Sequence, residues 1–141
     1  MKVYIKAMAV TTQDAKQQLI SAGGEAIEHL IKLYAFPDTE YTNHWRQEVW
    51  SFLRKVPKLK STKRYVDFAL IRDCLSAYED MIPELYSEIV NEYKSLTPAR
   101  FDMEELQRII GEYFDWIAQI LSEKGLVCPE DVYAILDKLG L

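Results

Sequence analysis

The sequence predicts an all-α protein, an irregular antiparallel bundle of five to six helices forming a single domain over residues 1–141. Apolar residues recur at spacings of three and four along nearly the whole chain, which is the period of an amphipathic helix. Only 5 Gly and 5 Pro interrupt the 141 residues, so long regular elements are expected. The 49% hydrophobic and 28% charged content is typical of a globular chain rather than a disordered one.

The first predicted helix runs from an N-cap at Thr12 to the end of the apolar pattern before Phe36-Pro37. Gly23-Gly24 lies in its middle, where each glycine costs roughly 1 kcal/mol relative to alanine. Two explanations stay open: the helix breaks there, or another backbone packs closely against the small patch Ala22-Gly23-Gly24. Residues 1–11 are expected to be a loosely ordered lead-in, because a lone alternating segment has no strand to pair with.

The second predicted helix begins at Thr42 or Asn43 and stops at Pro57. Its buried stripe should contain Trp45, Val49, Phe52 and Val56. A third helix is expected from Ser61 or Thr62 to about residue 80. Its apolar face is so wide that we place it, with the fifth helix, at the centre of the fold. That face includes Val66, Ala69, Leu70, Cys74, Ala77 and Met81.

Residues that favour helix N-termini predict the starts of three further helices. Pro83 suits a first helical position and predicts a fourth helix from about Ile82. Asp102 with Glu105 three residues later predicts the N-terminus of a fifth, and Pro129 that of a sixth. The fifth helix should carry a broad apolar face made of Leu106, Ile109, Ile110, Tyr113, Trp116, Ile117, Ile120 and Leu121.

The cysteines and the lack of a recognisable targeting signal predict a cytoplasmic protein. The net charge is -5, and an acidic chain is repelled on average by nucleic acid and anionic membranes. No window approaches 18 uninterrupted apolar residues, and the N-terminus does not read as a signal peptide. The two cysteines lie far apart, and a domain of this size needs no disulfide.

A basic segment at residues 54–64 is the clearest departure from this acidic background. It contains six basic and no acidic residues, namely Arg54, Lys55, Lys58, Lys60, Lys63 and Arg64. The rest of the chain then carries 11 basic and 22 acidic residues. Three interpretations stay open: a solvated loop paired with nearby acidic helices, a site for nucleic acid or another polyanion, and a site for an acidic protein.

Two tryptophans precede the basic segment on the second predicted helix. Trp50 lies about 100° round the helix from Val49, so it either fills the next groove or stays exposed. An exposed indole near Arg54 would be a natural anchor for a partner. We therefore take Trp45, Trp50 and the six basic residues as the candidate binding surface.

Motifs for catalysis, metals and cofactors are missing from the sequence. His29 and His44 belong to no recognisable triad or Glu-x-x-His pair, and no glycine-rich phosphate loop is present. The acidic stripe Glu84, Glu88 and Glu92 is expected to be a solvated helix face. We expect no cofactor and no metal, although an enzyme of unrecognised type with a site built from distant residues stays a third hypothesis.

The functional hypothesis ranked first is a non-catalytic interaction module that binds another protein or itself. The missing catalytic motifs and an aromatic content of 12% favour it. The second hypothesis is a binder of nucleic acid or another polyanion through residues 54–64.

Overall fold

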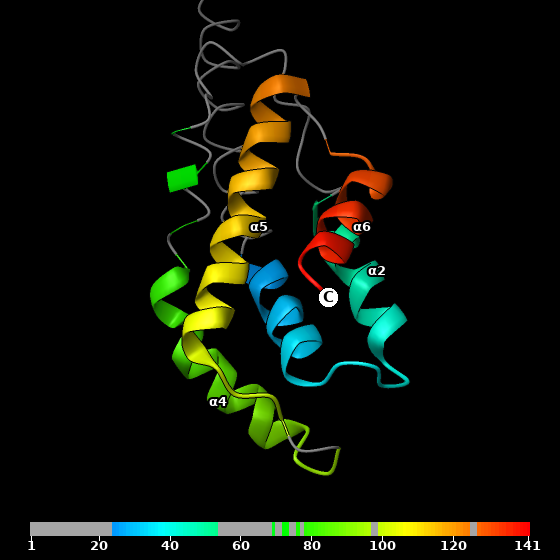
Figure 1. The fold of residues 1–141 in the computed structure, drawn as a ribbon, viewed down its shortest axis with the longest axis vertical. Coiled ribbons are helices and arrows are strands. Elements are labelled where there is room, and N and C mark those ends of the chain that lie inside the picture. The colour runs from blue at the N-terminus through cyan, green and yellow to red at the C-terminus, as the bar shows by residue number, and fades with distance from the viewer. Residues whose placement is uncertain are drawn as a thin grey trace, which may run out of the picture.

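The computed structural model describes residues 24–53, 69, 72–73, 76, 78–96, 99–124 and 127–141. All regular secondary structure in these ranges is helical, which confirms the predicted fold class (Figure 1). In this part of the chain, no helix combines the length and the apolar composition needed to cross a bilayer.

Residues 24–35 form a helix that is buried along most of its length. Gly24 already belongs to this helix, whereas Gly23 and the predicted start at Thr12 lie outside the described residues. The buried side chains include the large ones of Tyr34 and Phe36 together with Ile27, Leu30, Ile31 and Leu33. A helix buried on so many sides lies at the centre of a fold.

Helix α2 spans Thr42–Leu53 and begins where the sequence predicts. Thr42 Oγ1 accepts a hydrogen bond from the backbone N–H of Thr39 at 3.0 Å, which closes the turn before the helix. Trp45 and Val49 are both buried, so this part of the predicted stripe is confirmed.

Helix α4 spans Ile82–Glu92 with Pro83 in its first turn, and a 3-10 turn, η2, at Glu79–Met81 precedes it. The predicted start near Ile82 is confirmed. The expected burial of Met81 and Ala69 is wrong, because both side chains are exposed. For Met81 the reason is local: a 3-10 turn has 3.0 rather than 3.6 residues per turn, so it rotates a side chain away from the phase of the α-helical stripe.

Helices α5, Met103–Lys124, and α6, Pro129–Lys138, also begin at their predicted signals. Asp102 Oδ1 accepts the N–H of Glu105 at 3.1 Å and so caps α5. The buried face of α5 includes the predicted Leu106, Ile109, Ile110, Tyr113, Ile117 and Leu121. The chain ends packed against the core, with the N–H of Leu141 donating to Leu136 O at 2.8 Å.

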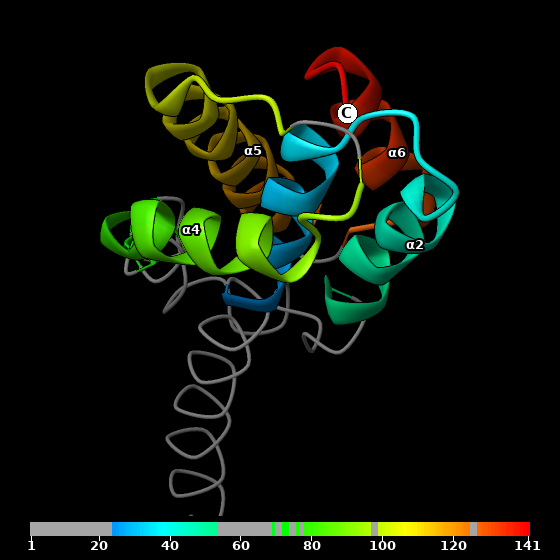
Figure 2. The same cartoon turned by 90° about the horizontal axis from the view of Figure 1, so that it is seen from below.

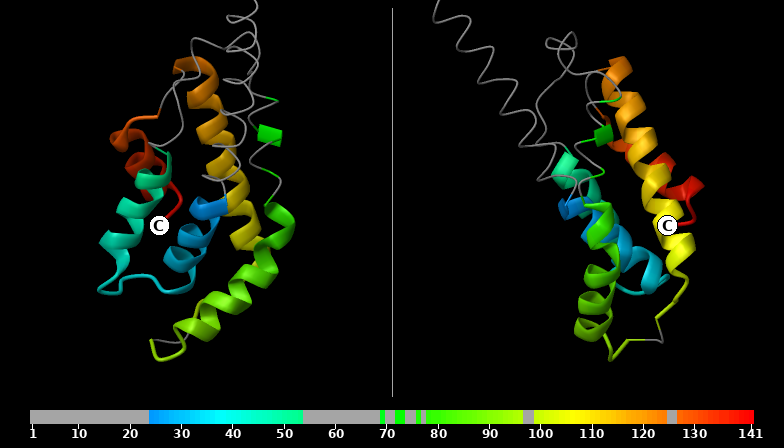
Figure 3. Two further views of the ribbon diagram at one scale, coloured as in Figure 1. Left: turned by 180° about the vertical axis from the view of Figure 1, so that it is seen from behind. Right: turned by 90° about the vertical axis from the view of Figure 1, so that its left-hand side faces the viewer.

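The 24–35 helix lies in the middle of the described elements, with α2, α4, α5 and α6 around it (Figure 2). The view from behind shows the same helix between α2 and α5 (Figure 3). Helix α2 packs beside α6, where Arg46 Nη2 lies 2.7 Å from Asp137 Oδ1. Arg72 joins η2 to α5, at 2.8 Å from Glu79 Oε1 and 2.6 Å from Asp115 Oδ1.

The predicted centre of the fold is therefore tested only in part. Helix α5 supplies a long buried face to the core, but the helix that the other described elements surround is the 24–35 helix, which the sequence did not single out. Most of the third predicted helix, including Val66, Leu70 and Cys74, lies outside the described residues.

Candidate functional site

The two tryptophans of the predicted binding surface do not present free indoles. Trp45 is only 2% exposed and packs under Tyr41 and Tyr93, with ring centroids 5.7 and 5.5 Å away. Trp50 is partly buried against the core. The six basic residues, Arg54, Lys55, Lys58, Lys60, Lys63 and Arg64, lie outside the described residues.

Exposed aromatic side chains occur elsewhere on the described surface. Phe101 is 72% exposed, well above Tyr41 at 39% and Trp116 at 38%. It lies in the connection between α4 and α5, two residues before α5 begins. Because most of the Phe101 ring is in solvent, its outer face adds no buried area to the folded protein. That face is therefore accessible to a partner.

The backbone on the N-terminal side of Phe101 is fixed by four contacts through Arg100. The N–H of Arg100 donates to Ala35 O at 2.9 Å, and Tyr86 Oη donates to Arg100 O at 2.5 Å. The Arg100 guanidinium lies 4.2 Å from the ring centroid of Tyr34 and donates through Nε to Tyr34 O at 3.1 Å. Burial raises the pKa of Tyr86, so its phenol stays protonated and able to donate.

The backbone on the C-terminal side is fixed through Asp102. Tyr34 Oη donates to Asp102 O at 3.2 Å, and Asp102 Oδ1 caps α5 through the N–H of Glu105. Burial, followed by the nearby Glu105 carboxylate, raises the pKa of Tyr34 and keeps that phenol neutral. Phe101 is thus held between two anchored neighbours on the end of the 24–35 helix.

The ring of Phe101 packs at its edge on α4. Its centroid lies 5.4 Å from that of Tyr86 at an interplanar angle of 62°, an edge-to-face arrangement that aromatic pairs favour. We call Phe101 and Tyr86, with the anchored residues Arg100 and Asp102, the Phe101 surface. On this surface an apolar ring protrudes into solvent, and the backbone that carries it is already ordered in the free protein.

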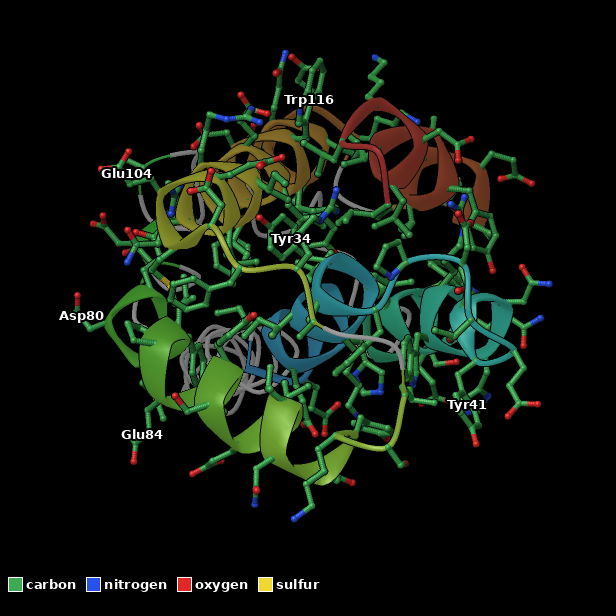
Figure 4. The ribbon with its side chains drawn as sticks, turned by 60° about the horizontal axis from the view of Figure 1, so that its bottom comes forward. Tyr34, Tyr41, Asp80, Glu84, Glu104 and Trp116 are labelled. Carbon is green, nitrogen blue, oxygen red and sulfur yellow. The ribbon has the colours of Figure 1, made fainter. Side chains whose placement is uncertain are left out.

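A small solvent-open cavity lies one helical turn from Tyr86 along α4. It has a volume of about 240 Å³ and is lined by Glu79, Asp80, Ile82 and Gln107. Figure 4 shows Asp80, Glu84 and Glu104 along one side of the molecule, around the starts of α4 and α5. The cavity therefore opens on an acidic side of the protein.

The histidines do not build a reactive site with the other described residues. His29 Nδ1 lies 2.9 Å from Glu25 O, and desolvation by burial lowers its pKa. His44 is exposed, with Nε2 at 3.8 Å from Glu48 Oε1 on the next turn of α2. Within the described ranges, no group of three or more His, Cys, Asp or Glu side chains is arranged to hold a metal ion.

Sequence reasoning missed the exposed aromatics and misplaced one of them. Trp116 was expected on the apolar face of the fifth helix, but its indole is exposed. Lys138 Nζ of α6 lies 4.4 Å from the centroid of the Trp116 ring. The neighbouring Ile117 and Ala118 occupy the buried face in its place. The sequence did contain a sign of the exposure of Phe101: this aromatic residue belongs to none of the predicted apolar helix faces and lies between Arg100 and the N-cap residue Asp102.

Comparisons with known proteins define no family for this chain. No protein-family model, no curated protein and no solved structure matches it. The described residues thus form a helical protein with an anchored aromatic surface and an acidic side.

Proposed function

We propose that this protein is a non-catalytic helical interaction module that binds another protein, or a second copy of itself, through the Phe101 surface. The observation that carries the proposal is a phenylalanine 72% exposed on a backbone anchored on both sides. Covering such a side chain would contribute roughly 1.5–3 kcal/mol to an association.

The anchored backbone favours binding in a second way. Association normally loses free energy in ordering loops and side chains at the interface. Because hydrogen bonds already fix Arg100 and Asp102, little of this cost remains at Phe101. Exposed, preorganised aromatic groups are typical of the few residues that dominate binding energy.

Site-specific photo-crosslinking tests the proposal. Phe101 is replaced by p-benzoylphenylalanine, and the same group is placed at the exposed Glu123 as a control. Glu123 lies near the other end of α5, roughly 30 Å away at the helical rise per residue. We expect a discrete product from position 101 only, and its mass distinguishes a second copy from another protein.

Competition makes this experiment specific. Excess wild-type protein should suppress the product, and excess Phe101→Ala protein should not. The proposal fails if position 101 gives no product, or if positions 101 and 123 give the same products.

A second candidate function, binding of nucleic acid or another polyanion through residues 54–64, is favoured by the segregation of charge. Residues 54–64 contain six basic and no acidic residues, whereas the rest of the sequence contains 11 basic and 22 acidic ones. Such a basic surplus favours phosphate contacts, which weaken steeply with salt.

Fluorescence anisotropy with short labelled DNA and RNA at increasing salt tests this second function. Binding that is lost when Lys58, Lys60, Lys63 and Arg64 become Glu supports it. No binding at low salt, where such contacts are strongest, excludes it.

We also propose that the complete chain is a single domain, an irregular antiparallel bundle of five to six helices, working in the cytoplasm. The short connections between the described helices support the bundle. The two widely spaced cysteines and the acidic composition support the location.

A further inference from the structure

The charges around the Phe101 surface are mostly negative. Asp102 and Glu104 lie directly after Phe101 at the start of α5, and both are exposed. Asp80 and Glu84 are exposed on the facing start of α4 (Figure 4). Asp80, Glu84 and Glu104 form no ion pair with other described residues, so their charges are directed to solvent.

Two arginines lie among these carboxylates, and one of them, Arg108, is neutralised by an ion pair. Arg100 lies over the ring of Tyr34 at 4.2 Å. Arg108 Nη1 lies 3.0 Å from Glu112 Oε1, one turn further along α5. Arg100 keeps its positive charge, because neither a ring nor a carbonyl neutralises it, but the exposed carboxylates of Asp80, Glu84, Asp102 and Glu104 outnumber it, so a partner meets a net negative potential at Phe101.

The cavity beside this surface has the chemistry for a long cationic side chain. Ile82 gives it an apolar wall, and Glu79, Asp80 and Gln107 give it polar ones. Glu79 already pairs with Arg72, so Asp80 is the carboxylate left for an incoming cation. Lysine and arginine combine an apolar stem with a charged head, which matches this lining.

We propose that the partner of the Phe101 surface is a basic polypeptide segment, with an apolar residue packed on Phe101 and a lysine or arginine paired with Asp80 in the cavity. This inference rests on the proposed function and names the chemistry of the partner. Phe101 supplies the anchor, and the unpaired carboxylates select a basic rather than an acidic or neutral occupant.

A random 12-residue peptide library displayed on phage tests the inference against the full chain. Clones are selected on wild-type protein, and clones that also bind Phe101→Ala protein are removed. We expect the remaining peptides to be enriched in lysine and arginine around an apolar residue. Peptides that depend on Phe101 but are neutral or acidic overturn the basic partner and leave the proposed function standing.

Binding of the most enriched peptide, labelled with fluorescein, is then measured by anisotropy. Replacing Asp80 by Asn and Glu84 and Glu104 by Gln should weaken the affinity roughly tenfold, as expected for three exposed ion pairs. The matched control changes Glu40, Glu123 and Glu130 to Gln, which alters the net charge equally at exposed positions elsewhere.

The outcomes separate the two claims. Equal weakening in the acidic-side variant and its control shows only nonspecific attraction and overturns the specific site. A library that gives no Phe101-dependent peptide contradicts the proposed function as well.

Discussion

Phe101 is exposed because the fold uses the backbone on either side of it and not its side chain. Arg100 and Asp102 tie the α4–α5 connection to Ala35 and Tyr34 at the end of the 24–35 helix. The side chain between them points away from these contacts, and the ring of Tyr86 packs at its edge. The sequence pattern could not reveal this, because the contacts with Tyr34 and Ala35 join residues more than 60 positions apart.

Gly24 shows at the same scale why a glycine occurs inside a helix. A Cβ atom at this position would lie 2.8 Å from two ring atoms of Tyr78. This supports close packing over a break at Gly24, with a side chain rather than a backbone as the neighbour. Glycine lowers the helix propensity at position 24, but it leaves the space that the Tyr78 ring occupies against the helix backbone.

The packing at Gly24 predicts opposite effects of one substitution in two backgrounds. Gly24→Ala should destabilise the wild type by about 1 kcal/mol, because overpacking exceeds the gain in helix propensity. In a Tyr78→Ala background the same change should stabilise by about 0.5–1 kcal/mol. Urea unfolding of the four proteins measures the coupling. A stabilising Gly24→Ala in the wild type would mean that the ring moves aside freely.

Asp131 predicts a pH dependence at the start of α6. Its Oδ2 accepts the N–H of Cys128 at 3.0 Å and lies 3.1 Å from Lys124 Nζ, and these contacts lower its pKa, the backbone hydrogen bond most. A lowered folded pKa means that the stabilisation is present above the unfolded value of about 3.9 and is lost as the pH falls through the folded pKa.

We therefore expect Asp131→Asn to be less stable than the wild type at pH 7, with a difference that shrinks below about pH 4. Guanidinium unfolding at pH 7 and pH 3 measures both stabilities. A difference of equal size at the two pH values would show that the charge of Asp131 is unimportant.

At the scale of elements, the sequence predicted the helix starts well because their signals are local. Pro83 and Pro129 each fix a first turn through the proline ring, and Asp102 fixes one through its side-chain cap. The orientation of single side chains was predicted less well. Trp116 follows the helical period of α5, but the groove beside it is already filled by Ile117 and Ala118. Which flank of a broad apolar face is covered depends on the neighbouring helices.

Helix α5 gives the prediction that tests the core. Ile110 is fully buried in its middle, so Ile110→Asp would bury a carboxylate without a partner and should abolish cooperative thermal unfolding. Gln107→Asp, on the exposed face one turn earlier, should melt within a few degrees of the wild type. Circular dichroism measures both. Cooperative melting of Ile110→Asp at the wild-type temperature would refute this assignment of the core.

For the whole molecule, the period of the sequence predicted the helical class but not which helices surround which. Among the described elements the 24–35 helix is central, and the contacts that place it join distant parts of the chain, such as Phe36 with Tyr93. The acidic cavity has the same origin, since Asp80 and Gln107 meet only after η2 packs on α5. The apolar periodicity of a single helix contains no information about which residues of two different elements come into contact.

The distribution of the three tryptophans over the fold gives a test of the whole arrangement. Trp45 is enclosed between α2 and α4, Trp50 is partly buried, and Trp116 is exposed beside Lys138. Acrylamide should therefore quench mainly the emission of Trp116. The Stern–Volmer slope should fall clearly in Trp116→Phe and should not fall in Trp45→Phe, with circular dichroism as the check that both variants fold. A fall in the slope of Trp45→Phe would mean that α2 and α4 do not enclose this indole, and the packing around the 24–35 helix would then have to be different.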